Sequence, residues 1–531
     1  MRNPVIDLPP RRALISLALI SLAGCAAWAE EPAAPAVPPP SRYNLQASLL
    51  GHAGTAMEMA AFAGPAPLTA VDLSLDKESP TPPTENKAGR MWGTGKGRSF
   101  LIPALEIPAF LGMLSIYDRH AYPDQMQDGK KVYSATFSST WDHLIHQHWV
   151  IDQDPFAINQ FMHPYQGTIF HGFARSAGLN YWEALAYDNM GSFEWKMAGE
   201  TDPPSINDQI ATGIGGSFFG EALFRMSSLL FEQDDKSPSL MRKVAATLIA
   251  PTSAFNRYAF GDRFRATFPS GDPAVYSWLQ LGAGLQSSQN DQGQRSTVNR
   301  NQAMLTFNFA YGLPGKDGYT YTRPFDYFHF EFDALANSGN KIDNVMIRGL
   351  LLGTDYSAGT GLDGIWGLYG GYDYISPFLF RVSSTSLSLG TTFQARLGET
   401  VTLQGSFLAG GGYGAAGNVT PVGERDYHYG LTPQALAALR LIVAGRVMLD
   451  ATDRYFYVSG TGSDNPGGNE SIHRLNAGLT VRLFGNQAVG FHYIESRRSA
   501  HYPGLPDSHQ AMGTVALSYT LLGKNGFSTV K

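Results

Sequence analysis

Five histidines lie close enough in the sequence to be considered as metal ligands. His143, His146 and His148 form one group, and His163 and His171 follow. Imidazole nitrogens are common zinc ligands, but the spacing matches neither H-E-x-x-H nor another recognised ligand pattern. On a helix His143 and His146 share a face that excludes His148, whereas on a strand His146 and His148 share a face that excludes His143. We therefore predict no metal site and no cofactor.

Carboxylic acids in the middle of the chain supply a second candidate chemistry, general acid–base catalysis. Several lie among aromatic residues, and burial among apolar groups raises a carboxyl pKa. The alternative is structural, since Glu221 and Arg225 are four residues apart and can pair on one helical face. We favour the structural role and leave catalytic residues unknown. The expected members of one partly buried polar cluster are His163, Arg175, Glu183, Glu194, Asp208, Glu221 and Arg225.

A lipid hydrolase would need a serine nucleophile activated by a histidine. The motif Gly-x-Ser-x-Gly is absent from the chain. His329 and His492 lie in predicted strands, and the sequence identifies no serine partner for either. Nucleophilic hydrolysis is therefore not predicted.

The composition of the chain excludes several classes of protein. The chain has 531 residues, of which 16% are charged, with 58 Gly and 25 Tyr. Soluble proteins carry about 25% charged residues. Beyond the first 30 residues no uncharged apolar run reaches the ~18 residues of a membrane-spanning helix, which excludes a polytopic helical membrane protein. The aromatic and apolar content excludes a disordered chain. The net charge of −6 argues against a nucleic-acid partner.

The N-terminus predicts export. Ala13 to Gly24 is an apolar stretch of signal-peptide length, and residues 1–29 are interpreted as the signal peptide. Leu22-Ala23-Gly24-Cys25 matches a lipobox in which Cys25 would be lipidated, whereas Ala27-Trp28-Ala29 is an alternative cleavage site. Cys25 is the only cysteine, so the chain forms no internal disulfide. Residues 30–98 form a Pro-rich linker and loop.

The C-terminal half alternates apolar and polar residues with a period of two. Turn clusters such as residues 315–318 and 464–468 separate about twelve segments of 10–14 residues. An even number of such segments is typical of a bacterial outer-membrane barrel, which we place at residues 257–523. A soluble sandwich or propeller is the alternative, but its strands are usually shorter. The expected strands are 274–287, 301–312, 324–336, 344–356, 364–375, 383–396, 400–412, 432–443, 445–458, 471–484, 487–498 and 511–522.

The alternation also predicts which side chains face lipid. Thr480 and Ser518 should face the lumen, since their neighbours are apolar. The expected lipid face carries Phe328, Phe330, Phe332, Leu479, Val481, Leu517 and Tyr519.

Residues 99–250 are predicted to form a helical domain. Helices are expected at 167–178, 181–198 and 206–231. The third contains Gly216-x-x-x-Gly220, a spacing that lets another backbone approach closely.

Several motifs in this segment occur together in a known order. They are Trp149-x-x-Asp152-x-Asp154-x-Phe156-x-x-Asn159-Gln160-x-x-His163-Pro164-Tyr165-x-Gly167, then Gly191-Ser192-x-x-Trp195, Gly199-Glu200, Pro204-Ser205-Ile206-Asn207-Asp208-x-Ile210 and Gly215-Gly216-x-x-x-Gly220-Glu221 with Arg225 and Ser227. Over residues 100–235 the chain resembles the bacterial family called domain of unknown function 3943. The resemblance implies an exported protein with a barrel-like C-terminus, but the family carries no established activity and transfers no catalytic residues.

Together these features predict a mainly β protein: a transmembrane antiparallel β-barrel of about twelve strands, preceded by a small α-helical domain that plugs or caps it. We expect location in the bacterial outer membrane, with outer-membrane lipid and the barrel-assembly machinery as partners. A structural, anchoring or gated-pore role is favoured. The alternative is an envelope-lipid-modifying enzyme with a site between the helices and the barrel.

Overall fold

The computed structural model describes residues 97–527, apart from 124–125, 128–129, 147, 153, 233–237, 261–266, 290–294, 297–300, 337–340, 360, 378, 419–424 and 464–466. The expected signal peptide, Cys25 and nearly all of the 30–98 linker lie outside the described residues, so these assignments stay predictions.

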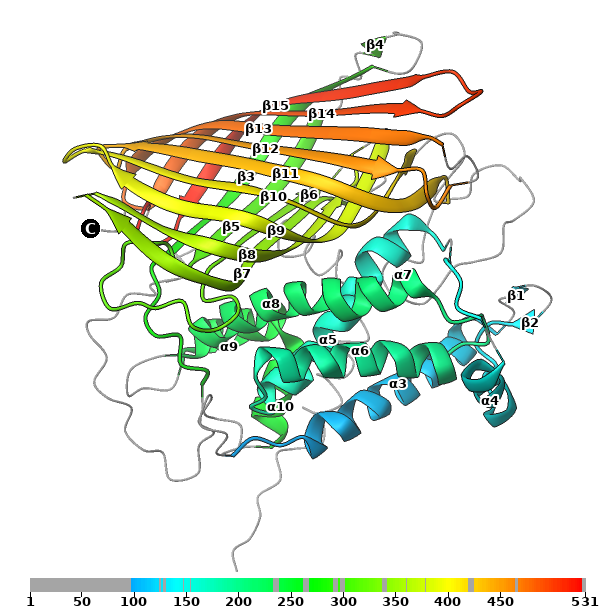
Figure 1. The fold of residues 1–531 in the computed structure, drawn as a ribbon. Helices are drawn as coiled ribbons and strands as arrows, with labels where there is room; N and C mark the ends of the chain where they lie inside the picture. The colour runs from blue at the N-terminus through cyan, green and yellow to red at the C-terminus, as the bar shows by residue number, and fades with distance from the viewer. Residues whose placement is uncertain are drawn as a thin grey trace, which may run out of the picture.

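A closed ring of twelve antiparallel strands forms the C-terminal part of the molecule (Figure 1). Sequence neighbours pair throughout, and β15 pairs with β3 to close the ring. All twelve expected segments become strands, in the expected order. The strands are β3 (Val275–Gln289), β5 (Asn301–Tyr311), β6 (Phe328–Leu335), β7 (Ile342–Ala358), β8 (Leu362–Ile375), β9 (Phe380–Arg396), β10 (Val401–Asn418), β11 (Tyr427–Val443), β12 (Val447–Ser459), β13 (Asn469–Phe484), β14 (Gln487–His501) and β15 (Ser508–Leu522), with a two-residue strand β4 (Arg295–Ser296) beside β3.

The two ends of the barrel differ in their connections. The start of the first strand and the end of the last strand lie at the same end of the barrel, since Trp278 pairs with Leu522. At this end, here called the termini end, most strands are joined by short turns, at 359–361, 397–400, 444–446 and 485–486. Longer connections at 419–426, 460–468 and 502–507 lie at the opposite end, here called the loop end.

The expected register of the strands is confirmed. Leu517 is 67% exposed on the outer face, while its neighbour Ser518 is only 9% exposed and faces the lumen. Likewise Leu479 is exposed outside, and Thr480 is buried inside. Because side chains alternate along a strand, these pairs fix the inner and outer sets of β13 and β15. Elsewhere the alternation is interrupted where the register shifts, as between Leu350 and Leu352 of β7.

Helices occupy residues 101–259. They are α3 (Leu101–Ala121), α4 (Phe137–Ile145), α5 (His163–Ser176), α6 (Tyr181–Ala198), α7 (Ile206–Asp208), α8 (Gly216–Phe231), α9 (Leu240–Ile249) and α10 (Pro251–Ala259), with π-helical turns η1 (Ile158–Met162) and η2 (Gln209–Gly215) and a small hairpin of β1 (Met126–Gln127) and β2 (Lys130–Lys131). The helix expected at 181–198 is correct. The one expected at 167–178 begins earlier, and the one at 206–231 divides into α7, η2 and α8.

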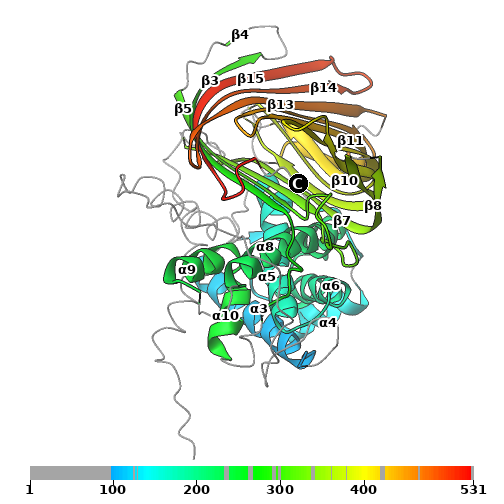
Figure 2. The same ribbon diagram turned by 90° about the vertical axis from the view of Figure 1, so that its left-hand side faces the viewer.

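The helices lie outside the ring of strands, along one side of the barrel (Figure 2). Phe219 of α8 packs against Tyr372 and Phe330, with ring centroids 5.9 and 6.1 Å apart. Both partners are on the outer face of the wall. The expected lipid-facing residues Phe328 and Phe330 are therefore outward but buried beneath helices. Among the described residues the helices do not enter the lumen, so the expected plug or cap is corrected to a domain docked on the outer wall.

Candidate functional site

One buried ionic cluster centres on Glu221, at the contact between α5 and α8. Arg175 Nε donates to Glu221 Oε2 at 2.7 Å, and Arg225 Nε donates to Oε1 at 2.8 Å. Arg225 also donates to Asp326, in the loop before β6, at 3.0 Å. All four side chains are at least 97% buried. Burial alone would raise the carboxyl pKa, but Arg175, His171 and Arg225 hold the pKa of Glu221 well below its ordinary value.

His171 extends this cluster to α6. Its Nδ1 lies 2.7 Å from Asp188 and its Nε2 lies 3.0 Å from Glu221. A ring whose two nitrogens both face carboxylates donates both hydrogen bonds only as imidazolium. Although burial opposes the charge, Asp188 and Glu221 raise the pKa of His171 to about 9. Burial raises the pKa of Asp188 to about 6, despite the nearby His171.

A second, separate cluster surrounds Asp208. Lys196 Nζ lies 2.6 Å from Asp208 and 3.0 Å from Glu200, and His163 Nε2 lies 3.3 Å from Asp208. Burial opposes ionisation, yet His163 and Lys196 hold the pKa of Asp208 far below its ordinary value. Ser205 donates to the same carboxylate, so Asp208 fixes the start of α7.

The single predicted cluster is therefore wrong, because the seven residues divide among separate places. Arg175, Glu221 and Arg225 meet, whereas His163 and Asp208 belong to the second cluster. Glu183 instead forms the N-terminal capping box of α6 and pairs with Arg98 at 2.8 Å near the surface. Glu194 lies on the partly exposed face of α6, where partial burial raises its pKa. No sequence pattern pointed to Lys196, whose ammonium group is buried among three acids, Asp208, Glu200 and Asp152.

The candidate histidine ligands are also separated. His143 binds the backbone carbonyl of Lys196 through Nδ1, at 3.1 Å, and His146 pairs with Asp142 at the surface. His148 is exposed. No group of three or more His, Cys, Asp or Glu side chains within the described part of the chain is arranged to hold a metal ion.

Amide side chains connect the helices to two tyrosines of β11. Asn159 Nδ2 donates to the Tyr427 hydroxyl, and Gln160 Nε2 donates to the Tyr429 hydroxyl, each at 2.9 Å. Asn207 Nδ2 donates to Tyr429 at 2.9 Å as well. Each of these amides belongs to a motif that the sequence singled out. Their role is to hold the domain against the wall.

The lumen is crossed by charged side chains toward the loop end, here called the charged layer. Arg474 of β13 donates to Asp343 at 2.6 Å. Asp343 lies on β7, six strands away in the twelve-stranded ring, so this pair crosses the barrel. Arg454 of β12 donates to Asp373 at 3.0 Å and to Asn344 at 2.7 Å. These bonds fill the cross-section with paired side chains, as expected for charges buried in a narrow barrel.

Aromatic side chains cross the lumen nearer the termini end, here called the tyrosine layer. The Tyr276 hydroxyl of β3 donates to Met448 of β12 at 3.4 Å. The Arg440 guanidinium lies 3.9 Å from the centre of the Tyr276 ring. Tyr327 and Tyr369 pack in the same apolar group.

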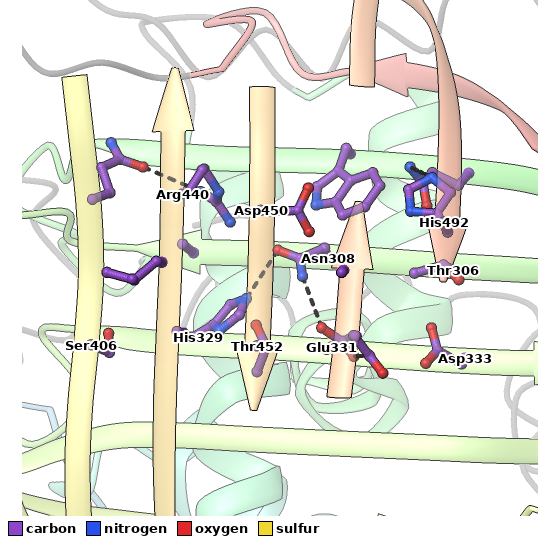
Figure 3. Close-up of a pocket in the computed structure, with 18 of the residues that line it drawn as sticks. Thr306, Asn308, His329, Glu331, Asp333, Ser406, Arg440, Asp450, Thr452 and His492 are labelled. Atoms are coloured by element: carbon purple, nitrogen blue, oxygen red, sulfur yellow. Dashed lines mark hydrogen bonds between the residues drawn. The ribbon is translucent and has the colours of Figure 1, made fainter. Parts of the chain in front are cut away.

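Between the two layers lies an internal cavity of about 100 Å³ (Figure 3). Its walls carry carboxylates, amides and hydroxyls from strands on several sides of the ring. In Figure 3 Asn308 bridges His329 and Glu331, with which it forms hydrogen bonds of 3.0 and 3.2 Å. The cavity thus lies within the barrel, and its walls combine these polar groups with apolar side chains such as Trp278 and Met304.

One lumen contact contradicts the sequence analysis. His492 Nε2 lies 3.0 Å from Ser518 Oγ, so this histidine has a serine partner. The residues come from β14 and β15, where Gly490 pairs with Ser518. The hairpin connection at 502–507 fixes that pairing, and registering the two predicted strands against each other would have brought the two side chains together.

The fold thus defines a twelve-stranded antiparallel barrel with a helical domain on its wall. Residues 148–252 match the family model described as "Domain of unknown function (DUF3943)", which confirms the resemblance seen in the sequence. The match begins at residue 148, later than the expected start at residue 100. It extends beyond the expected end at residue 235 to the start of α10. No curated protein matches the sequence.

Solved outer-membrane proteins resemble the barrel only distantly. The NanC porin is 7% identical, with a TM-score of 0.24, over 45% of this chain and 98% of that one. An outer membrane channel from Pseudomonas putida F1 is 9% identical, with a TM-score of 0.26, over 47% and 95%. The channel DcaP of Acinetobacter baumannii is 6% identical, with a TM-score of 0.21, over 46% and 96%. At such scores the assignment as a barrel rests on the strand pairing of this chain itself.

Proposed function

We propose that the protein is an outer-membrane β-barrel whose function is to anchor the helical domain against its own outer wall. The observation that carries this proposal is the lateral docking of the helices. Phe219 packs on outward aromatic rings, the amides of η1 bind β11, and Arg225 reaches Asp326. Such a junction combines aromatic packing with buried hydrogen bonds, which favours a fixed position over a flexible tether.

The rest of the outer wall supports contact with outer-membrane lipid. Exposed apolar side chains cover strands away from the helices, among them Leu389, Leu431, Phe491 and Leu517. Within the described residues, α3 is the one helix long and apolar enough to cross a membrane, and 28% of its apolar window is buried. A continuous apolar exterior is stabilised by hydrocarbon and not by water. A barrel of this kind would be inserted by the barrel-assembly machinery.

The lumen supports an anchoring role in preference to an open pore. The charged layer and the tyrosine layer both cross it, and each is held by hydrogen bonds or ring contacts between distant strands. The cavity between the two layers lies in the lumen and not at the helix–barrel junction. No observation therefore favours a lipid-modifying site at that junction.

Cutting the chain between the two parts tests the anchoring proposal. A specific protease recognition sequence inserted within residues 261–266 allows cleavage between α10 and β3. If the lateral contacts hold the domain, the cleaved helical fragment co-purifies in mild detergent with a barrel that carries a C-terminal affinity tag. Release of the fragment from the parent protein would show that the domain is merely tethered.

Two variants test whether the proposed junction holds the cleaved fragment. Phe219→Ala removes a large side chain from the junction at a cost of about 3–5 kcal/mol, so the cleaved fragment should dissociate. Trp141→Ala, on the exposed face of α4, should leave the fragment bound, because its ring is 53% exposed. Equal retention in both variants would contradict the proposed junction.

A further inference from the structure

A serine and a histidine meet in the lumen cavity at the distance required for nucleophilic catalysis. Ser518 Oγ lies 3.0 Å from His492 Nε2, and Ser518 lines the cavity. Ser518 is 9% exposed, so little bulk solvent reaches its hydroxyl. A serine becomes a nucleophile when an adjacent base takes its proton as the new bond forms. A contact between a serine and a histidine is common in proteins. The other neighbours of the imidazole therefore determine whether this pair can act in catalysis.

A carboxylate lies on the other side of Gly478 from the second nitrogen of the same ring, without a direct hydrogen bond to it. Asp450, Gly478 and His492 lie in one row on β12, β13 and β14. A Cβ placed on Gly478 would lie 2.8 Å from Asp450 Oδ1 and 3.0 Å from His492 Nδ1. The absence of a side chain at Gly478 thus leaves room for one water to bridge the two groups. Asp450 Oδ1 is buried with no hydrogen-bond partner.

The neighbours of His492 determine which nitrogen carries the proton. The Gln280 amide nitrogen donates to His492 Nε2 at 2.9 Å, and Ser518 Oγ lies 3.0 Å from the same nitrogen. Nε2 therefore holds the lone pair, and the proton is on Nδ1, facing Asp450. The Trp278 ring stacks on the imidazole with centroids 6.0 Å apart, which restricts its rotation.

We propose that Ser518, His492 and Asp450 form a hydrolytic triad inside the barrel, in which Asp450 acts on His492 through one water. Ser518 Oγ attacks the carbonyl carbon of an ester while His492 Nε2 takes the hydroxyl proton. The carbonyl carbon becomes tetrahedral, and its oxygen becomes an oxyanion. The bond from carbon to the leaving oxygen breaks, and His492 returns the proton to the departing alcohol.

Water completes the cycle. It attacks the acyl–serine ester, gives its proton to His492 and releases the carboxylic acid and Ser518, so no oxidant or further reactant is needed. Asp450 is a positioning residue that stabilises the imidazolium formed in each half. The cavity of about 100 Å³ restricts the substrate class to esters with a short acyl group.

Labelling with a fluorophosphonate tests the proposal on the full chain in detergent. This probe phosphonylates an activated serine and expels fluoride, and it leaves unactivated serines unlabelled. The parent protein should be labelled at Ser518, identified by mass spectrometry of the modified peptide, and should hydrolyse p-nitrophenyl acetate. An unlabelled parent, or a label on another residue, would overturn the proposal without any variant being required.

Variants assign the roles of the individual residues. Ser518→Ala should abolish labelling, and His492→Ala should lower the labelling rate by about 10³-fold or more. Ser406→Ala is the matched control, since Ser406 also lines the cavity but pairs with Thr392 at 2.9 Å. Heat-modifiable migration in gels verifies that each variant is a closed barrel. Labelling that survives in Ser518→Ala contradicts the triad.

The variant Asp450→Asn distinguishes a role of Asp450 in positioning His492 from a purely structural role in packing. Because asparagine favours the wrong histidine tautomer, kcat for p-nitrophenyl acetate should fall by about 10²–10⁴-fold, with KM nearly unchanged. A purely structural role would alter folding or KM and leave kcat of the folded fraction intact.

Discussion

Glu221 shows how one buried carboxylate organises the helical domain. It accepts hydrogen bonds from two arginines and faces His171, and all these groups are buried. Burying charges is unfavourable unless the partners are complete, so the arrangement specifies one packing of α5 on α8 more than it adds stability. The spacing of Glu221 and Arg225 predicted their pairing. Arg175 was expected in the same cluster, but its contact with Glu221 could not be predicted, because it depends on how a second helix packs.

Replacing Glu221 should therefore be far more damaging than replacing a surface glutamate. Glu221→Gln leaves the Arg175 guanidinium buried without its carboxylate partner, while Arg225 keeps Asp326, and we expect a loss of about 3–5 kcal/mol in the free energy of unfolding. Glu183→Gln is the matched control. It alters a partly exposed pair with Arg98 and should cost less than about 1 kcal/mol. Urea unfolding followed by helical circular dichroism measures both. Similar losses would contradict the structural assignment of Glu221.

His171 makes the stability of the helical domain dependent on pH. Its pKa is raised from the ordinary 6.5 to about 9 in the folded state. A raised pKa means that the folded form binds the proton more tightly, so this stabilisation is complete below pH 6.5 and is lost as pH rises through about 9. The raised pKa of Asp188, about 6, acts in the same direction at lower pH. We expect a lower thermal midpoint at pH 9 than at pH 6.5, and a much smaller difference in His171→Gln.

At the scale of elements, the strands could be predicted and the docking of the helices could not. The alternation of Phe328, Phe330 and Phe332 with polar neighbours fixes which face points outward. It does not tell whether lipid or a helix covers that face, because both environments favour apolar side chains. The outcome depends on contacts such as Phe219 with Tyr372, which join residues far apart in the chain.

The sequence correctly predicted the role of the glycine spacing in α8, which is to let another helix backbone approach closely. A Cβ on Gly216 would lie 2.6 Å from Gly167 Cα, so the backbones of α5 and α8 are in direct contact there. Gly216→Ala should force the helices apart at a cost of about 1–3 kcal/mol. Gly112→Ala in α3 is the control, since nothing lies within 4 Å of its added Cβ, and it should be neutral or stabilising by up to about 1 kcal/mol. Equal thermal midpoints for the two variants would refute close α5–α8 packing.

At the scale of the whole molecule, the lumen residues were recognisable as inward-facing, but their partners were not. Arg474 and Asp343 meet because the ring closes and brings β13 opposite β7. That distance across the barrel depends on the cumulative register of many strands, which no local pattern reports. The placement of Asp450 and His492 in one row likewise depends on the registers of β12, β13 and β14, although each residue lay in a correctly predicted strand.

The membrane assignment can be tested with two leucines of similar exposure. Leu517 is 67% exposed on the barrel wall, and Leu505 is 60% exposed in the connection between β14 and β15. If lipid surrounds the wall, Leu517→Arg should cost about 2–4 kcal/mol near the bilayer midplane. Leu505→Arg should cost little, because a loop residue keeps its charge in water. The folded fraction in membranes, read from heat-modifiable migration, should fall for the first variant alone. A soluble barrel would tolerate both changes equally.

The two lumen layers predict that the parent barrel conducts poorly in planar lipid bilayers. Arg454 and Arg474 are the long side chains that cross the lumen, so shortening both removes the groups that fill its cross-section. We expect Arg454→Ala with Arg474→Ala to raise the conductance of the folded fraction. The loss of Arg474 as the partner of Asp343 will reduce stability, whereas Asp373 keeps its pair with Arg348. Arg497→Ala is the matched control: this arginine is exposed on β14 and pairs with Glu495 at the surface, so its loss should leave conductance unchanged. Because the tyrosine layer remains in the double variant, a further rise on adding Tyr276→Ala would show that the layers close the lumen in series. A parent that already conducts as well as these variants would contradict a closed lumen and restore the gated-pore interpretation.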